Sequence, residues 1–145
     1  MESLILDRCN IDDNVINNVV SLSKLKSLSL FNCEFINNPE KLFNMLNLKN
    51  LYIDNVIFDL NLLENNLYDS LILSNITINK YFNINVNRLD IKKCLILDFS
   101  FLSGNIKTLI VSEKQYQNYL PLQQYLGHMI IMENNGQMVL KEVNK

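Results

Sequence analysis

The sequence has few of the residues that interrupt regular structure. Its 145 residues include no alanine, no tryptophan, three glycines and two prolines. So few glycines exclude a collagen-like chain and a glycine-rich linker protein. The sequence also lacks a large excess of positive or negative charge, since its net charge is −2. This balance argues against a function dominated by attraction to nucleic acid or to an anionic membrane, because both usually require a basic excess.

Cysteine is scarce too, with only Cys9, Cys33 and Cys94. An odd number without a Cys-x-x-Cys pair argues against both a disulfide framework and a zinc site, and favours a reducing compartment. The apolar run in residues 1–8 is too short for a signal peptide, and no stretch approaches the 18 apolar residues of a membrane-spanning helix. We therefore expect a cytoplasmic protein without membrane contact.

Asparagine, leucine and isoleucine are abundant instead, with 24, 25 and 16 copies. Lysine outnumbers arginine 11 to 2, and this pattern is typical of an AT-rich coding sequence. Our first interpretation of the asparagine excess is therefore genome composition, and a functional role is the alternative. The leucine and isoleucine content excludes a disordered chain, and the length predicts one domain over residues 1–145.

One phrase recurs along the chain, in the form Leu-x-Leu-x-x-(Cys, Asn or apolar)-x-apolar. Its first copy contains Leu4, Leu6 and Cys9. The copies start at residues 4, 28, 51, 71, 89, 109 and 129, so the units are 18 to 24 residues long. Apolar residues at alternate positions predict short strands with one buried face, near residues 4–6, 28–30, 51–53, 71–73, 89–91, 109–111 and 129–132.

This pattern resembles the leucine-rich-repeat family, in a short and irregular form with Cys or Asn at the turn, whose unit is 20–29 residues. The resemblance covers nearly the whole chain. It implies an α/β solenoid of about seven short parallel strands with helical or 3₁₀ returns. Two features depart from the family pattern: one unit has only 18 residues, and Val56, Ile76 and Lys114 occupy the Asn/Cys position. We expect Cys9 and Cys33 to be neighbours, as free thiols rather than a disulfide.

The segments between the strands differ in length. Apolar spacing or an early proline predicts short helices in residues 14–24, 39–46 and 119–126, whereas 79–85 and 97–104 are long enough only for extended or 3₁₀ returns. Asn134-Asn135-Gly136 between two apolar runs predicts a β-hairpin as a C-terminal cap over residues 133–145. The first strand has no such cap, so either its edge frays or another chain covers it.

The family resemblance implies that a partner binds the concave face of the sheet. Side chains between the buried leucines point to that face. The candidate residues are Phe31, Tyr52, Asp54, Ile72 and Ile110, with a ladder of Asn32, Asn55 and Asn75 beside them. Exposed apolar and aromatic side chains are typical of a partner site. The alternative is that an isoleucine-rich composition placed them there.

Basic residues gather near the fifth repeat, at Lys80, Arg88, Lys92 and Lys93. A solvated charged face is the ordinary explanation for such a group. The alternatives are contacts to the phosphates of RNA, as in an accessory protein of a ribonucleoprotein particle such as a ribosome, or contacts to an acidic peptide.

Residues for catalysis are missing from the pattern. There is a single histidine, His128, no Gly-rich phosphate-binding loop and no spaced pair of metal ligands. We therefore expect no catalytic residue, metal or cofactor. The sequence favours a non-enzymatic protein–protein interaction module, a subunit or adaptor of a larger intracellular assembly. The ribonucleoprotein accessory protein is the first alternative and a secreted effector the second.

Overall fold

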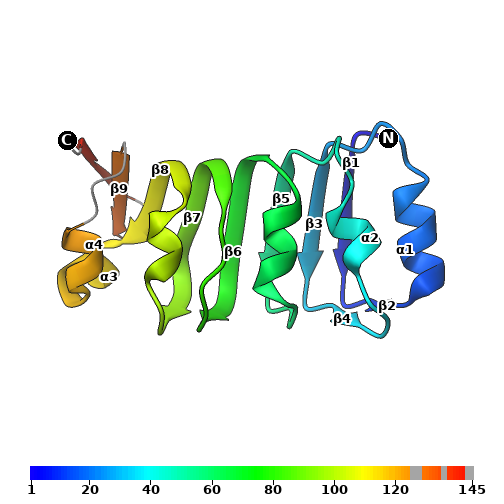
Figure 1. The fold of residues 1–145 in the computed structure, drawn as a ribbon, viewed down its shortest axis with the longest axis horizontal. Coiled ribbons are helices and arrows are strands. Elements are labelled where there is room, and N and C mark those ends of the chain that lie inside the picture. Colours follow the sequence, from blue (N-terminus) through cyan, green and yellow to red (C-terminus); the bar gives the residue numbers. More distant parts are fainter. Residues whose placement is uncertain (125–128, 135–136, 143–145) are drawn as a thin grey trace.

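The computed structural model describes the backbone of residues 1–124, 129–134 and 137–142, and the side chains of residues 1–124. It is a mixed α/β fold built on one large sheet, whose strands lie side by side along the long axis of the molecule (Figure 1). In spatial order the strands are β1 (Ser3–Asp7), β3 (Ser27–Phe31), β5 (Asn50–Asp54), β6 (Tyr68–Ile78), β7 (Asn85–Ile96), β8 (Asn105–Ser112), β9 (Met129–Asn134) and β10 (Gln137–Glu142).

Within this sheet the spatial order of the strands follows their order along the chain. The pairs from β1 to β9 are parallel, as the sequence predicted, and β10 is antiparallel to β9. The C-terminal edge of the sheet is thus formed by an antiparallel strand, as expected for the hairpin, although the turn at Asn135-Gly136 is outside the described residues.

The leucines of the repeat stack in register. Leu4 is opposite Leu28, and the same column continues through Leu51, Leu71, Leu89 and Leu109. The last step differs from the prediction, because Leu109 pairs with Ile130 rather than with Met129. The predicted last unit was therefore placed one residue too early. Because successive residues of a strand face opposite sides of the sheet, this shift exchanges the residues assigned to the two faces.

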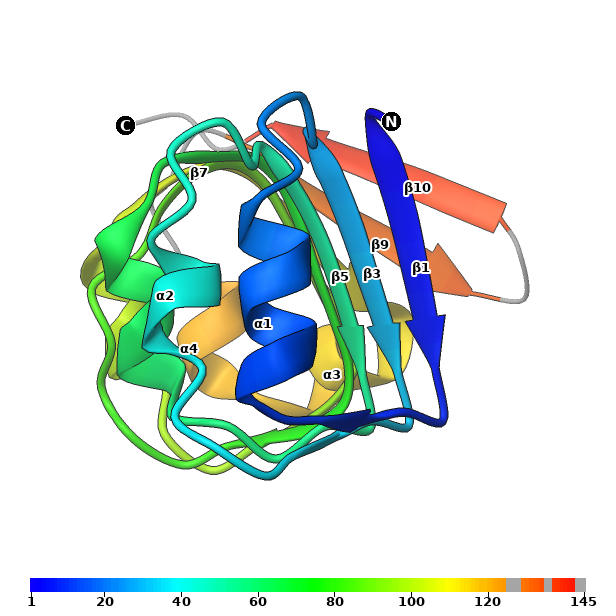
Figure 2. The ribbon, with the colours of Figure 1, turned by 90° about the vertical axis from the view of Figure 1, so that its right-hand side faces the viewer.

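The core lies between one face of the sheet and the return segments. Figure 2 shows α1 (Asp13–Val20) and α2 (Glu40–Phe43) on one side of β1, β3 and β5. Asp12 begins α1 by accepting a hydrogen bond from the Val15 N–H at 3.0 Å, a stabilising N-cap. The helix buries Ile16 and Val19, whose spacing of three residues gives it one apolar face.

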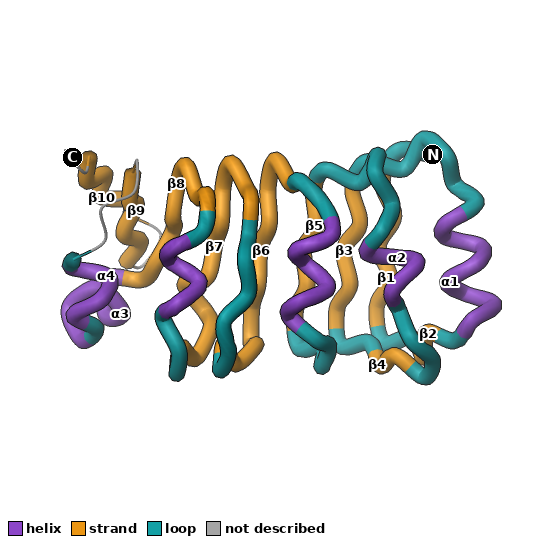
Figure 3. Tube along the Cα trace, in the orientation of Figure 1, coloured by secondary structure: helices purple, strands orange, loops and turns teal. Residues whose placement is uncertain are grey.

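The return at 97–104 holds a 3₁₀ turn, η2 (Ser100–Ser103), and residues 79–84 contain no helix, as expected from their length. A second 3₁₀ turn, η1 (Leu60–Asn65), was not predicted, and α3 (Glu113–Asn118) and α4 (Leu120–Gln123) follow near the C-terminal end (Figure 3). Stacked rings fill the core under them: Phe82 and Phe101 are 5.5 Å apart, and Phe43 and Phe58 are 5.5 Å apart. None of the described helices is long and apolar enough to cross a bilayer.

Two strands are much longer than predicted, because they continue around the turn at their C-terminal end. The N-terminal units instead stop there and form a separate ladder of β2 (Asn10–Ile11) and β4 (Glu34–Phe35). In the β6–β7 pair, Ile72 is opposite Asp90 but Ser74 is opposite Lys93, so β7 contains one extra residue at this point. Such bulges bend a strand without ending it. The predicted repeat starts at residues 71 and 89 would place Ser74 opposite Lys92, so from this point that register is wrong by one residue.

Candidate functional site

Three of the predicted binding residues form a cluster on the outer face of the sheet, the face opposite the core. The rings of Phe31 and Tyr52 meet edge to face, with centroids 4.9 Å apart, and Ile72 is the register partner of Tyr52 on the next strand. All three side chains are partly exposed. We call these three residues the aromatic patch. Edge-to-face rings are a favoured arrangement, so the patch is held in shape before any partner arrives.

Carboxylates lie on both sides of Phe31. The register places Asp7 opposite Phe31 on one neighbouring strand and Asp54 opposite it on the other. Paired strands are separated by about 4.8 Å, so both carboxylates are within a side chain's reach of the ring. Asp54 Oδ1 accepts a hydrogen bond of 2.9 Å from Asn75 Nδ2, which fixes this carboxylate. The patch therefore combines apolar surface with negative charge.

The asparagine ladder has a conformational cause. Asn32, Asn55 and Asn75 have φ values of 54°, 53° and 51°, and Arg8 occupies the equivalent place with 56°. Asparagine is enriched several-fold among non-glycine residues with positive φ. The ladder is also bonded from side chain to side chain, since Asn55 Nδ2 donates to Asn32 Oδ1 at 2.8 Å. Asparagine makes the turn directly after β3 and β5 and at the equivalent point inside β6, so a binding role is not needed to explain it.

The outer face is open at its N-terminal end and closed toward its C-terminal end. Ile5 is 64% exposed, whereas Asp90 and Ile110, which occupy the same row, are 7% and 2% exposed. Ile110 is buried outside the main core cluster and contributes no accessible surface. It is therefore separate from the aromatic patch, with which the sequence had grouped it.

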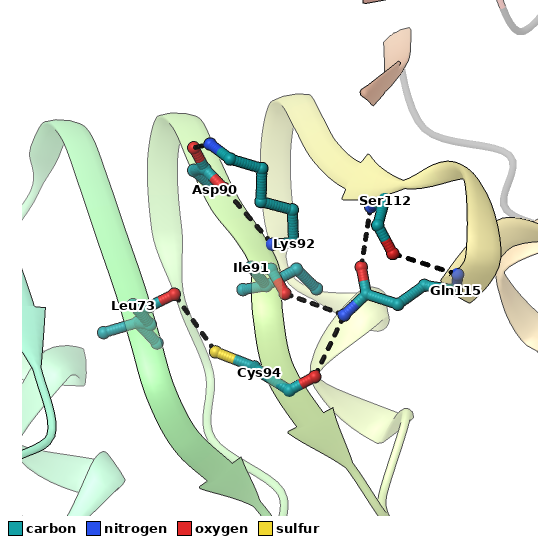
Figure 4. A network of polar contacts seen from close by, with 7 residues as sticks. All are labelled: Leu73, Asp90, Ile91, Lys92, Cys94, Ser112 and Gln115. Carbon is teal, nitrogen blue, oxygen red and sulfur yellow. Dashed lines mark hydrogen bonds and ion pairs between the residues drawn. The ribbon is translucent and has the colours of Figure 1, made fainter. Parts of the chain in front are cut away.

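The predicted basic residues are distributed over several places. Lys80 follows the end of β6 and pairs with Asp59 at 3.1 Å. Lys92 Nζ contacts Asp90 Oδ2 at 2.6 Å, and the two side chains are only 25% and 9% exposed (Figure 4). Arg88 is exposed opposite Ser70, near the start of the strand pair, while Lys93 is exposed near its middle. These four residues are thus not one continuous basic surface.

Gln115 is a structural residue that the repeat pattern did not identify. Its Nε2 donates to the carbonyl oxygens of Ile91 at 2.9 Å and Cys94 at 3.0 Å, and its Oε1 accepts from the Ser112 N–H (Figure 4). Ser112 Oγ accepts from the Gln115 N–H in return, which makes a capping box for α3. The signal was present in the sequence as Ser-x-x-Gln.

The cysteines are free thiols, as predicted for Cys9 and Cys33, and two of them join neighbouring strands. All three are free, Cys33 Sγ donates to the Leu6 carbonyl at 3.3 Å, and Cys94 Sγ donates to the Leu73 carbonyl at 3.1 Å. Burial raises the pKa of Cys33 and raises the pKa of Cys94 to about 12. Thiols held in the neutral form are poor nucleophiles, which suits a structural role.

Within the described part of the chain, no group of three or more His, Cys, Asp or Glu side chains is arranged to hold a metal ion. Comparison with known proteins gave no matching family model, no matching curated protein and no matching solved structure.

Proposed function

We propose that this chain is a leucine-rich-repeat solenoid and a non-enzymatic protein-binding module, working as a subunit or adaptor of a larger intracellular assembly. Its partner binds the outer, concave face of the sheet at the aromatic patch. The observation that carries the proposal is the pair of partly exposed rings, Phe31 and Tyr52, set between the carboxylates Asp7 and Asp54.

The solenoid part of the proposal is supported by the repetition of the same contact in successive units. The leucine column continues in register from β1 to β8, and the strands of this sheet follow one another in chain order. Cys33 and Cys94 occupy the Cys/Asn position of their repeats, and each donates to a carbonyl of the neighbouring preceding strand. Four equivalent turns share a positive φ.

The chemistry of the patch defines the partner. Partly exposed aromatic rings are typical anchors of protein interfaces. A Lys or Arg side chain of the partner would meet the Phe31 ring with a carboxylate on each side, combining a cation–π contact with charge pairing. The partner therefore presents a basic residue next to an apolar one.

A displayed library of random peptides tests this proposal. The wild-type protein should enrich peptides that contain Lys or Arg beside an aromatic or aliphatic residue. Phe31→Ala with Tyr52→Ala should abolish that binding, because truncating interface anchors typically costs at least about 2 kcal/mol each. Asp7→Asn with Asp54→Asn should weaken it and remove the preference for basic residues.

Tyr81→Ala is the matched control, since this exposed aromatic lies in the loop between β6 and β7. Binding that survives the double alanine variant, or is equally lost in the control, would contradict the proposal. Co-purification from cells with and without nuclease tests the ribonucleoprotein alternative, which a nuclease-sensitive association would favour.

The edge of the sheet at β1 offers a second contact. Leu4 and Leu6 are only partly buried, whereas their register partners Leu28 and Leu30 are 1% and 0% exposed. We propose that another chain covers this edge. The Arg8 N–H donates to the Phe31 carbonyl, so the alternate amides of Ile5 and Asp7 face the open edge. Slowed hydrogen exchange of the Ile5 and Asp7 amides on assembly supports the idea, and unchanged exchange in the assembled state contradicts it.

A further inference from the structure

A hollow lies away from the aromatic patch, where the C-terminal half of β7 meets α3. Its volume is about 330 Å³, close to the lower limit of about 300 Å³ for small-molecule sites. Lysines are prominent in its lining: Lys92, Lys93 and Lys114 are joined there by Cys94, Leu95, Ser112, Gln115, Asn118 and Tyr119. No Asp or Glu belongs to this lining, although the whole chain has a net charge of −2.

The lysines of this hollow are not equivalent. Lys92 Nζ is held by Asp90 at 2.6 Å, so most of its charge is already balanced. Lys93 and Lys114 are exposed, and neither forms an ion pair with any residue that the structure describes. Glu113, the carboxylate next to Lys114 in sequence, accepts a hydrogen bond from Gln117 Nε2 at 3.2 Å. Two positive charges thus remain available at the hollow.

The position of the two lysines is fixed by the backbone beneath them. Gln115 ties α3 to β7 through the carbonyls of Ile91 and Cys94, on either side of Lys93. The capping box with Ser112 fixes the first turn of α3, which carries Lys114. Because the amide of Gln115 is fully used, the two elements cannot slide apart without breaking buried hydrogen bonds. The hollow is therefore formed before a ligand enters.

We infer that this hollow binds a single phosphate group, with Lys93 and Lys114 as its charged ligands. A phosphate monoester carries a charge between about −1.5 and −2 and three acceptor oxygens, which matches two ammonium groups and a lining without carboxylates. The amide of Asn118 is a further donor at the rim. The size of the hollow suits one phosphate with its immediate attachment rather than a length of nucleic acid.

Two sources share this chemistry, free phosphate and a phosphorylated side chain of a protein. An NMR titration with inorganic phosphate, compared with sodium chloride at the same ionic strength, detects the shared chemistry. We expect phosphate to shift the amide signals of Lys93, Lys114 and Asn118, while chloride leaves them unmoved. A phosphoserine peptide and its unphosphorylated form are then added in the same way. Tighter binding of the phosphopeptide than of phosphate identifies a phosphorylated side chain, and equal binding identifies free phosphate.

The variant that tests the site is Lys93→Gln with Lys114→Gln, which should weaken phosphate binding at least about tenfold by removing two charge-assisted contacts. The matched control, Lys24→Gln with Lys41→Gln, removes the same charge from exposed lysines elsewhere and should bind as the wild type does. The circular dichroism of both variants should match that of the wild type.

Three results would overturn the inference. They are shifts no larger with phosphate than with chloride, an equal loss of binding in the control variant, and binding of single-stranded RNA through Lys93 without any response to phosphate. None of them bears on the aromatic patch, so the two proposals stand or fall separately.

Discussion

Strands β3 and β5 end after five residues, whereas β6 and β7 continue for 11 and 12 residues around the same turn. In the first group the turn is made by the backbone, with an asparagine at positive φ after the strand. In the second group paired bulges carry the strands onward. Asn75 still has a positive φ of 51°, but it lies inside β6, and Lys93, which pairs with Ser74 on β7, does not have a positive φ.

The outer face changes with the turn. Beside β3 and β5 it is open and carries the aromatic patch, while beside β7 and β8 it contains the half-buried ion pair of Asp90 with Lys92 and the buried Ile110. One repeat pattern thus produces two kinds of surface. The open end carries the aromatic patch to which we assign the proposed partner, and the C-terminal half has the lysine-lined hollow beside α3.

The largest loss of stability should come from removing the Gln115 side chain, which joins α3 to β7 in the C-terminal half. Gln115→Ala leaves the buried carbonyls of Ile91 and Cys94 without this donor and should lower the free energy of unfolding by about 3 kcal/mol. Urea denaturation measures it. Gln117→Ala, exposed on the same helix, is the control and should stay within about 0.5 kcal/mol of the wild type. Equal stability of the two variants would show that this connection is unimportant.

A smaller effect should come from the backbone turn of the N-terminal half. Asn55→Val places a β-branched residue at a φ of 53°, which should cost about 2 kcal/mol, whereas Asn55→Gly should be close to neutral because glycine accepts this conformation. Asn55→Asp keeps the tolerance for positive φ but removes the donor to Asn32. If the valine and glycine variants unfold at the same urea concentration, φ is not what selects asparagine here.

The smallest change in the free energy of unfolding should come from ionisation of Cys94 in alkaline solution. Burial raises the pKa of Cys94 to about 12 in the folded chain, above the value of 9.0 for a free thiol. Its contribution to stability is complete below pH 9 and is lost as the pH rises toward 12, because the unfolded thiol ionises first. Between pH 9 and 10 the wild type should therefore lose about 1 kcal/mol relative to Cys94→Ala. Parallel pH profiles of the two proteins would contradict the assigned burial.

Much of the fold could be predicted because its signals are local and repeated. Alternating leucines gave the strand positions, and the Asn-Gly dipeptide pointed to the antiparallel strand at the end. The errors have physical causes as well. The bulge between Asp90 and Lys93 and the one-residue shift at Ile130 depend on how a strand fits its neighbour, which the spacing within a single strand does not record.

The candidate site could be predicted only in part. The sequence brought Phe31, Tyr52, Ile72 and Asp54 together correctly, because they occupy neighbouring rows of the repeat. It did not predict that Ile110 is buried, nor that Asp90 pairs with Lys92. Both depend on how much of the outer face is covered by other parts of the chain, which the repeat spacing does not show. Gln115 was missed because it lies outside the repeat column, one residue after Lys114.

By itself the sequence determined that leucines at alternate positions form strands with one buried face, because side chains alternate between the two faces of a strand. Return segments between successive copies are long enough to bring each strand back in the same direction, which favours parallel pairing. The scarcity of glycine left asparagine to make the turns at positive φ, which accounts for the ladder of Asn32, Asn55 and Asn75. Only the tertiary structure decided which strands stop and which continue, and thereby where the outer face is open. That choice depends on hydrogen bonds between units more than 17 residues apart, such as those of Gln115, 21 and 24 residues from its partners.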